Sequence, residues 1–403
     1  MFLSKKSVTF AVSALAMLCS GTTFAKEAPQ AHKAVELSIL HINDHHSYLE
    51  PHEARINLNG QQTKVDIGGF SAVNGKLYEL RKKYKNPLVL HAGDAITGTL
   101  YFTLFGGSAD AAVMNAGNFD YFTLGNHEFD AGNEGLLKLL EPLKIPVLSA
   151  NVIPDKNSIL YNKWKPYDIF TVDGEKIAII GLDTVNKTVN SSSPGKDVKF
   201  YDEIATAQIM ANVLKQQGIN KIILLSHAGS EKNIEIAQKV NDIDVIVTGD
   251  SHYLYGNDEL RGLKLPVIYE YPLEFKNPNG EPVFVMEGWA YSAVVGDLGV
   301  KFSPEGIASI TRKIPHVLMS SHKLQVKNAE GKWTELTGDE RKKALDTLKS
   351  MKSISLDDHD AKTDMLISKY KSEKDRLAQE IVGVITGSAM PGGSANRIPN
   401  KAG

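Results

Sequence analysis

Five short apolar runs in this chain are each followed directly by polar side chains that can bind metals, and this recurrence constrains the fold most strongly. The runs have the length of buried strands rather than of helices. They lie at residues 35–40, 88–90, 121–124, 221–225 and 245–247. In an open α/β sheet, the loops after the strands converge on one crevice. We therefore expect the five polar motifs to form one site.

The central motif is the stretch Gly125-Asn126-His127-Glu128-Phe129-Asp130, which follows the apolar run from Tyr121 to Leu124. It brings an amide, an imidazole and two carboxylates into six residues that begin with a glycine. Taken alone, such a stretch is also compatible with an ordinary polar turn. The four similar arrangements elsewhere in the chain favour a functional site.

The candidate metal ligands are all oxygen or imidazole nitrogen donors. They are Asp44, His46, Asp94, Asn126, His227, Asp250 and His252. Each alone has an ordinary explanation as a turn residue or a hydrogen-bonded histidine, but five motifs in succession favour metal binding. Seven donors exceed one tetrahedral shell, so we predict two divalent ions that share a carboxylate. Zn²⁺ and Mn²⁺ are preferred, and Fe²⁺ and Co²⁺ also suit these donors.

His127 lies next to a candidate ligand, so we expect its ring to reach a substrate rather than a metal. Asp130, three residues later, can hold the imidazole in one tautomer and favour its protonated form. Two metals about 3.5–4 Å apart can clamp the attacking and leaving oxygens of a phosphoryl transfer. The pattern therefore indicates a metal-dependent phosphohydrolase.

The first 25 residues have the features of a secretory signal peptide. A basic start with Lys5 and Lys6 precedes an apolar segment at 8–18 that is too short to span a bilayer. A small-residue cleavage site ends at Ala25. A bulky leucine precedes Cys19, which argues against a lipoprotein anchor. We expect cleavage after Ala25, a periplasmic protein and no stable membrane anchor.

Composition excludes several other kinds of protein. Cys19 is the only cysteine, so a chain cleaved after Ala25 has no disulfide and no thiolate metal site. The formal net charge is −2, which argues against a nucleic-acid-binding surface. The basic run 81–83 is better explained as the end of a helix, where it complements the dipole. We expect a monomer.

Alternating apolar strands and helical patterns predict an α/β fold, a layered two-sheet domain with flanking helices. Helices are expected at 71–84, 109–116, 134–141, 204–217 and 234–240. A hairpin is expected at 170–180 with an Asp-Gly turn, and antiparallel strands at 266–314. The charged stretch 345–381 has a helical period and predicts one polar helix that bridges domains.

The expected domain organisation follows from these patterns. The divisions are a signal peptide at 1–25, the two-sheet domain at 26–340, a linker with the bridging helix at 341–385, and the start of a further domain at 386–403.

The motifs, in this order, resemble those of the calcineurin-like metallophosphoesterases. They are Asp44-x-His46, Gly93-Asp94, Gly125-Asn126-His127-Glu128, Ser226-His227 and the Gly249 motif. The residues of the first and third motifs, together with Ser149-Ala150-Asn151, are similar to those of the exported bacterial 5′-nucleotidases. The stretch 249–253 looks like the corresponding motif of the periplasmic NAD nucleotidases.

This resemblance implies a role for each candidate residue. One metal would be held by Asp44, His46, Asp94 and His252, and the other by Asp94, Asn126, His227 and Asp250, with Asp94 as the bridge. His127 and Asp130 would be the catalytic pair. The implied substrates are NAD, NMN and AMP. One departure is Asp250, because most relatives have histidine there, and a carboxylate adds negative charge and a harder donor.

Family members carry a C-terminal domain after the bridging helix, where aromatic side chains and arginines hold the substrate. This sequence ends at Gly403, where such a domain should begin. We therefore expect weak, unselective phosphoesterase activity and an exposed bridging helix. Two alternatives remain open: a 2′,3′-cyclic-nucleotide phosphodiesterase, and a fragment that binds metal but does not catalyse a reaction.

Overall fold

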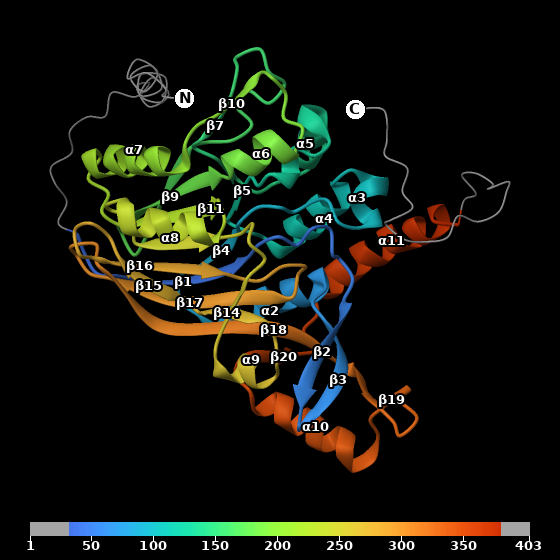
Figure 1. The fold of residues 1–403 in the computed structure, drawn as a ribbon. Coiled ribbons are helices and arrows are strands. Elements are labelled where there is room, and N and C mark those ends of the chain that lie inside the picture. Colours follow the sequence, from blue (N-terminus) through green and yellow to red (C-terminus); the bar gives the residue numbers. More distant parts are fainter. Residues whose placement is uncertain (1–31, 380–403) are drawn as a thin grey trace.

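The computed structural model describes residues 32–379, and two β-sheets packed face to face form its centre (Figure 1). The predicted signal peptide with its cleavage site after Ala25, and the predicted segment 386–403, lie outside the described residues. Among the residues described, no helix combines the length and apolar character needed to cross a membrane.

The first sheet has ten strands, and its parallel part carries three of the predicted strand-end motifs. Its main path runs in the order β2-β3-β18-β17-β1-β4-β5-β6, while β19 and β20 pair with β18. The parallel strands are β1 (Val35–Ile42), β4 (Pro87–His91), β5 (Tyr121–Thr123) and β6 (Val147–Leu148). The remaining strands are β2 (His52–Leu58), β3 (Gln61–Ile67), β17 (Val294–Phe302), β18 (Ala308–Lys327), β19 (Trp333–Glu335) and β20 (Ile354–Leu356).

The second sheet has six strands in the order β15-β16-β12-β11-β9-β8, and its parallel part carries the other two motifs. The parallel strands are β9 (Glu175–Asp183), β11 (Ile222–His227), β12 (Val245–Thr248) and β16 (Pro282–Glu287). The antiparallel edges are β8 (Tyr167–Val172) and β15 (Leu273–Lys276). Two small ribbons are β7 (Val152–Pro154) with β10 (Val198–Phe200), and β13 (Leu254–Gly256) with β14 (Val267–Glu270).

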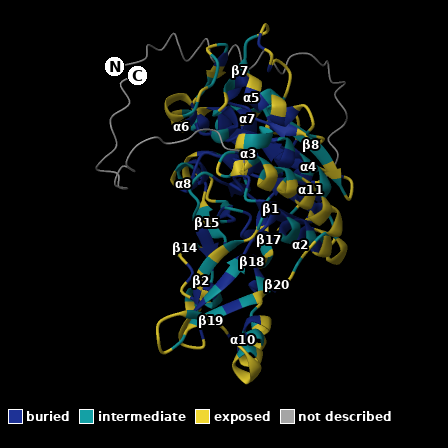
Figure 2. Ribbon diagram, turned by 90° about the vertical axis from the view of Figure 1, so that its right-hand side faces the viewer, coloured by how far each residue is buried: buried dark blue, intermediate teal, exposed yellow. Residues whose placement is uncertain are grey.

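Helices cover the outer faces of both sheets, so the core has three apolar layers. Apolar side chains such as Ile39 and Val247 fill the space between the sheets. The first sheet packs outward on α2 (Phe70–Lys83), α4 (Ser108–Gly117), α5 (Gly132–Leu140) and α11 (Ala361–Leu377). The second packs on α7 (Glu203–Gln216) and α8 (Ser230–Lys239). The remaining helical elements are α3 (Leu100–Phe105), η1 (His127–Phe129), α6 (Val185–Ser191), α9 (Asp258–Gly262) and α10 (Gly338–Ser350). This layered α/β arrangement confirms the predicted fold class, and Figure 2 shows its buried centre.

The prediction of one polar helix over 345–381 is wrong for the residues described. Two helices, α10 and α11, are separated by β20, which pairs in parallel with β18. Nor is α11 free of contacts, since Ile367 is only 9% exposed and Tyr370 packs against Phe105 at a ring distance of 5.0 Å. Lys371 also pairs with Glu50 at 2.8 Å. The division predicted at residue 340 stays a prediction.

Candidate metal centre

All five predicted motifs lie at the carboxyl ends of parallel strands. Asp44 and His46 follow β1, Asp94 follows β4, and Asn126 follows β5. His227 is the last residue of β11, and the loop after β12 carries Asp250 and His252. These strand ends belong to two different sheets, which the packed core brings together (Figure 1). The site therefore forms across the two sheets rather than on one of them.

The carboxylate of Asp44 lies at the centre of one group of candidate ligands. Its Oδ1 is 3.2 Å from His252 Nε2 and 3.7 Å from His46 Nε2. It is also 3.8 Å from His227 Nε2. The potential ligand atoms of Asp44, His46 and His252 all lie within 4.8 Å of one another, which is compatible with one shared cation.

Asp94 faces candidate ligands from both predicted metal sites. Its Oδ2 is 3.0 Å from His227 Nε2 and 3.7 Å from His46 Nε2. Asp44, Asp94 and His227 form a second group within 4.8 Å, and His46, Asp94 and His127 a third. Because one oxygen of Asp94 faces an imidazole from each predicted set, its position suits a bridging ligand.

Asp250 and Asn126 complete the predicted constellation. Asp250 Oδ1 is 3.9 Å from His227 Nε2, and the terminal amide of Asn126 lies 3.2 Å from the same oxygen. With its side-chain oxygen turned toward Asp250, Asn126 can share a cation with it. The structure thus brings all seven predicted ligands together.

The loops that carry these ligands have unusual backbone conformations. Five ligands have positive φ angles: Asp44 (48°), His46 (48°), Asp94 (54°), Asp250 (84°) and His252 (56°). Residues other than glycine rarely adopt positive φ, and each residue held in this backbone conformation costs of order 1–3 kcal/mol of stability. The surrounding fold therefore stabilises loop conformations that place the donor atoms.

Three glycines allow the strand ends to approach closely. A Cβ on Gly93 would lie 2.5 Å from His227 Nδ1, and one on Gly125 would lie 2.3 Å from Asp94 Oδ1. A Cβ on Gly249 would meet Asp44 Oδ2 at 2.7 Å. These contacts are shorter than a carbon atom tolerates, so the glycines are needed for the ligands to converge.

Two histidines are oriented to offer Nε2 as a ligand. The Nδ1 of His227 lies 2.6 Å from the carbonyl oxygen of Ala92, and that of His46 lies 2.9 Å from the carbonyl of Thr97. A carbonyl only accepts, so each Nδ1 carries a hydrogen, and Nε2 is the nitrogen left to bind a metal once it has lost its own proton. His227 Nε2 is buried and makes no hydrogen bond, although Asp94 Oδ2 lies 3.0 Å away. A metal ion is the partner that this arrangement suits.

The charges of the site also suit cations. Burial raises the pKa of Asp44 and Asp94, but nearby histidines, His227 first, hold both pKa values below the ordinary range. Burial lowers the pKa of His46, yet hydrogen bonding to Asp44 and the charges of Asp94 and Asp44 raise it to about 9. The site is thus a dense arrangement of anionic oxygens and imidazoles, and the donors fit two divalent ions.

Glu128 belongs to the central motif, but its role is visible only in the tertiary structure. It is fully buried, and its carboxylate accepts hydrogen bonds from the backbone nitrogens of Asp94 (2.9 Å), Ala95 (2.8 Å) and Gly125 (2.7 Å). Burial, together with the charge of Asp94, raises its pKa to about 7. Glu128 therefore ties two ligand loops together.

A second buried group supports the loop after β1. His45 Nδ1 lies 2.8 Å from His91 Nε2, and its Nε2 lies 3.1 Å from Asp110 Oδ1. Burial lowers the pKa of His45 to about 3 and raises that of Asp110 to about 7. His45 stands between two candidate ligands in the sequence, whereas only the tertiary structure shows that Asp110 supports it.

His127 and Asp130 form a close pair at the rim of the metal centre. His127 Nδ1 lies 2.6 Å from Asp130 Oδ2, and Ser192 Oγ donates to the other oxygen of Asp130 at 2.8 Å. The hydrogen bond to Asp130 raises the pKa of His127. The His127 side chain is 38% exposed, whereas those of Asp44, His46, Asp94 and His227 are at most 6% exposed, so the ring faces a molecule bound from solvent.

Lys187, on α6, was not anticipated from the sequence. Its Nζ lies 2.7 Å from Asp250 Oδ1. A lysine on a short, polar helix gives no sequence signal of such a contact. It places a positive charge beside the carboxylate that departs from the usual motif.

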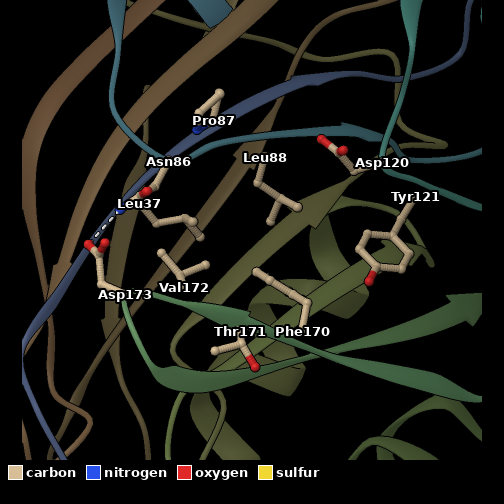
Figure 3. Close-up of a pocket in the computed structure, with 10 residues that line it drawn as sticks. All are labelled: Leu37, Asn86, Pro87, Leu88, Asp120, Tyr121, Phe170, Thr171, Val172 and Asp173. Carbon is tan, nitrogen blue, oxygen red and sulfur yellow. Dashed lines mark hydrogen bonds between the residues drawn. The ribbon is translucent and has the colours of Figure 1, made fainter.

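The best-defined cavities among the described residues lie away from this centre. One of about 330 Å³ lies at the opposite ends of β4 and β5, where Pro87 and Tyr121 begin these strands (Figure 3). Asn86 Nδ2 donates to Asp173 Oδ2 at one end of it (2.9 Å).

The fold and the converging strand ends are those of a phosphoesterase domain. A match to the calcineurin-like phosphoesterase family covers residues 37–254, and the chain belongs to this family. The chain is 95% identical to the NAD 5′-nucleotidase of Haemophilus influenzae over 403 residues, which are all of this chain and 67% of that protein. It is 49% identical over 365 residues to a probable 5′-nucleotidase of Treponema pallidum, covering 91% of this chain and 62% of that protein.

The solved structure of Haemophilus influenzae NAD nucleotidase has the same fold. The TM-score is 0.88 with 97% sequence identity, over 92% of this chain and 66% of that chain. The chain thus spans about two thirds of the length of these relatives.

Proposed function

We propose that this chain is the metal-binding part of an exported phosphohydrolase that acts on nucleotides. Its reactions are cleavage of the NAD pyrophosphate to NMN and AMP, and dephosphorylation of 5′-mononucleotides to nucleosides. The observation that carries the proposal is the joint presence of all seven predicted ligands and the His127–Asp130 pair in one site. The identity of 95% to a NAD 5′-nucleotidase supports the choice of substrates.

Two divalent ions, Zn²⁺ or Mn²⁺, occupy the site in this proposal. Asp44, His46, Asp94 and His252 would hold one ion, and Asp94, Asn126, His227 and Asp250 would hold the other. Two such ions would supply activation of a water and neutralise charge on the phosphoryl group. The protein works in the periplasm as a monomer.

The chain's own residues supply the remaining chemistry. Water attacks phosphorus and loses one proton to solvent, the bond from phosphorus to the leaving oxygen breaks, and that oxygen takes up a proton. His127 is the group placed to give this proton from Nε2, because Asp130 holds its Nδ1–H. Asp130 also stabilises the protonated ring, and Ser192 keeps Asp130 in place. Glu128 fixes the loops that carry Asp94 and Asn126.

The test compares hydrolysis by the purified chain of NAD, AMP, a 2′,3′-cyclic nucleotide and a small aryl phosphate, with Zn²⁺ or Mn²⁺ and with a chelator. Metal-dependent release of NMN and AMP from NAD, and of phosphate from AMP, supports the proposal. Turnover of the cyclic nucleotide alone would favour a cyclic-nucleotide phosphodiesterase. No hydrolysis of any of the four with metal bound would mean that the chain is not catalytic by itself.

A further inference from the structure

Lys187 reaches the atom of Asp250 that a metal ion would use. Its Nζ lies 2.7 Å from Asp250 Oδ1 and 3.3 Å from the backbone oxygen of the same residue. The same Oδ1 lies 3.9 Å from His227 Nε2 and 3.2 Å from the terminal amide of Asn126. The ammonium group therefore lies at the edge of the predicted second metal site.

The position of Lys187 is built into the fold rather than left to a mobile surface side chain. The helix α6 is fixed at its start by a hydrogen bond from Val185 N to Glu203 Oε1 (2.8 Å). Thr188, on the same helix, is buried and donates to Asp183 Oδ2 (2.9 Å). These contacts orient the helix that carries Lys187 toward the metal centre.

The segment containing α6 also reaches the catalytic pair. Ser192, directly after the helix, donates to Asp130 Oδ1 at 2.8 Å. One short segment thus contacts two residues of the site. Lys187 contacts the predicted metal ligand Asp250, and Ser192 contacts Asp130, which pairs with the predicted proton donor. A phosphoryl group that reaches both the metals and His127 must lie beside this segment.

Exposure separates the floor of the site from its rim. The side chains of Asp44 and His227 are completely buried, whereas that of Lys187 is 50% exposed. A lysine ammonium has three donors, and only two acceptors, both from Asp250, lie within hydrogen-bond distance among the described residues. A cation with a spare donor at the rim of an anionic-substrate site is suited to a phosphate oxygen.

We propose that Lys187 binds a phosphate oxygen of the substrate, and that it offsets the extra negative charge that Asp250 brings to the metal centre. This inference rests on the proposed function. When a cation takes Asp250 Oδ1, the ammonium loses its best acceptor and turns to the anion bound at the rim. Lys187 is then a substrate-binding residue, and Asp250 and Lys187 together replace the neutral histidine of most relatives.

The experiment measures inorganic phosphate binding to the metal-loaded chain by calorimetry at low salt, which requires no turnover. Lys187→Met should weaken phosphate binding about tenfold, the low end for a hydrogen bond to a charged group because the site is half exposed. Lys187→Arg, which keeps the charge, should restore most of the affinity. Lys199→Met is the matched control, since Lys199 forms a similar exposed pair with Asp155 at 2.6 Å, and it should change nothing.

A second readout is metal affinity, measured by titrating the metal-free chain with Zn²⁺. Lys187→Met should bind the metal equally or more tightly, because a positive charge beside the site is removed. Weaker metal binding by this variant would show that Lys187 only orients Asp250, and unchanged phosphate affinity would equally overturn the proposal. Because neither measurement depends on hydrolysis, an inactive parent chain would refute the proposed function without deciding this inference.

Discussion

Replacing Asp130 by Asn tests the catalytic pair, because Asn keeps the shape of the side chain but removes its charge. The hydrogen bond to Asp130 raises the pKa of His127. The His127 side chain is 38% exposed and that of Asp130 is 23% exposed, so solvent screens the pair. We therefore use the interaction energy of exposed rather than buried ion pairs, which is about 1 kcal/mol at the upper end of its range. Because this interaction favours the protonated ring, the pKa of His127 should fall in Asp130→Asn.

The sign of the pH effect follows from the raised pKa. The protonated imidazole donates the proton, so activity is present at low pH and is lost as the pH rises through the pKa of His127. In Asp130→Asn this falling limb of kcat/KM should move to lower pH. The rate below the limb should also drop about tenfold or more, since the ring loses its orientation. The assay is aryl phosphate hydrolysis from about pH 5 to pH 9 at saturating metal.

Two results would contradict this reasoning. If the falling limb of kcat/KM lies at the same pH in Asp130→Asn and in the parent, the limb does not report the titration of His127. A limb that moves to higher pH would mean that the group seen is not a cation stabilised by Asp130. Ser192→Ala is the milder companion variant, because it removes only the hydroxyl that donates to Asp130 Oδ1 at 2.8 Å.

Three further predictions concern the metal centre. His127→Ala should keep the fold and bound metal but lose about 10²–10⁴-fold in turnover, checked by elemental analysis beside rate measurements. Elemental analysis of the parent should give close to two metals, and Asp94→Asn should lower the occupancy of both. Asp168→Asn, on the edge strand β8 of the second sheet, is the control and should leave the occupancy unchanged. A single metal whose occupancy is unaffected by Asp94→Asn would exclude a bridging role for Asp94. Gly249→Ala should weaken metal binding and lower the free energy of unfolding by about 1–3 kcal/mol, because its Cβ would meet Asp44 Oδ2 at 2.7 Å. Gly262→Ala has open space and should be neutral in the same denaturation experiment.

The candidate site was predictable from the sequence for a local reason. Each ligand stands just after an apolar run, and a parallel strand delivers the residues after it to one edge of the sheet. Asp94 and Asn126, which follow the neighbouring strands β4 and β5, could therefore be proposed as neighbours although they are far apart in the chain. The hairpin β2–β3 also has a local sequence signal, the Asn59-Gly60 pair at its turn, where both residues have positive φ.

The segment after residue 338 shows where local pattern fails. Its charged residues with a helical period extend across the short strand β20, so period alone predicted one helix. The backbone of Ile354–Leu356 pairs instead with Val317–Met319 of β18, and this sheet pairing breaks the helix. On α11, one apolar stripe with Ile367 and Tyr370 suffices to dock the helix on the domain. The sequence of the segment itself does not indicate such a partner surface.

The sequence by itself determined the donor types, their order and their places after strands, because these depend only on residue identity and local apolar pattern. Tertiary structure decided which strand ends meet, since β1 and β12 belong to different sheets and only the packed core aligns them. It also decided the positive φ of Asp250 and the contact of Lys187 with it. An exposed lysine on a short helix has no preferred partner in sequence. Its partner is set by where α6 docks, and that position depends on hydrogen bonds that tie the helix to Asp183 at the end of β9 and to Glu203 at the start of α7.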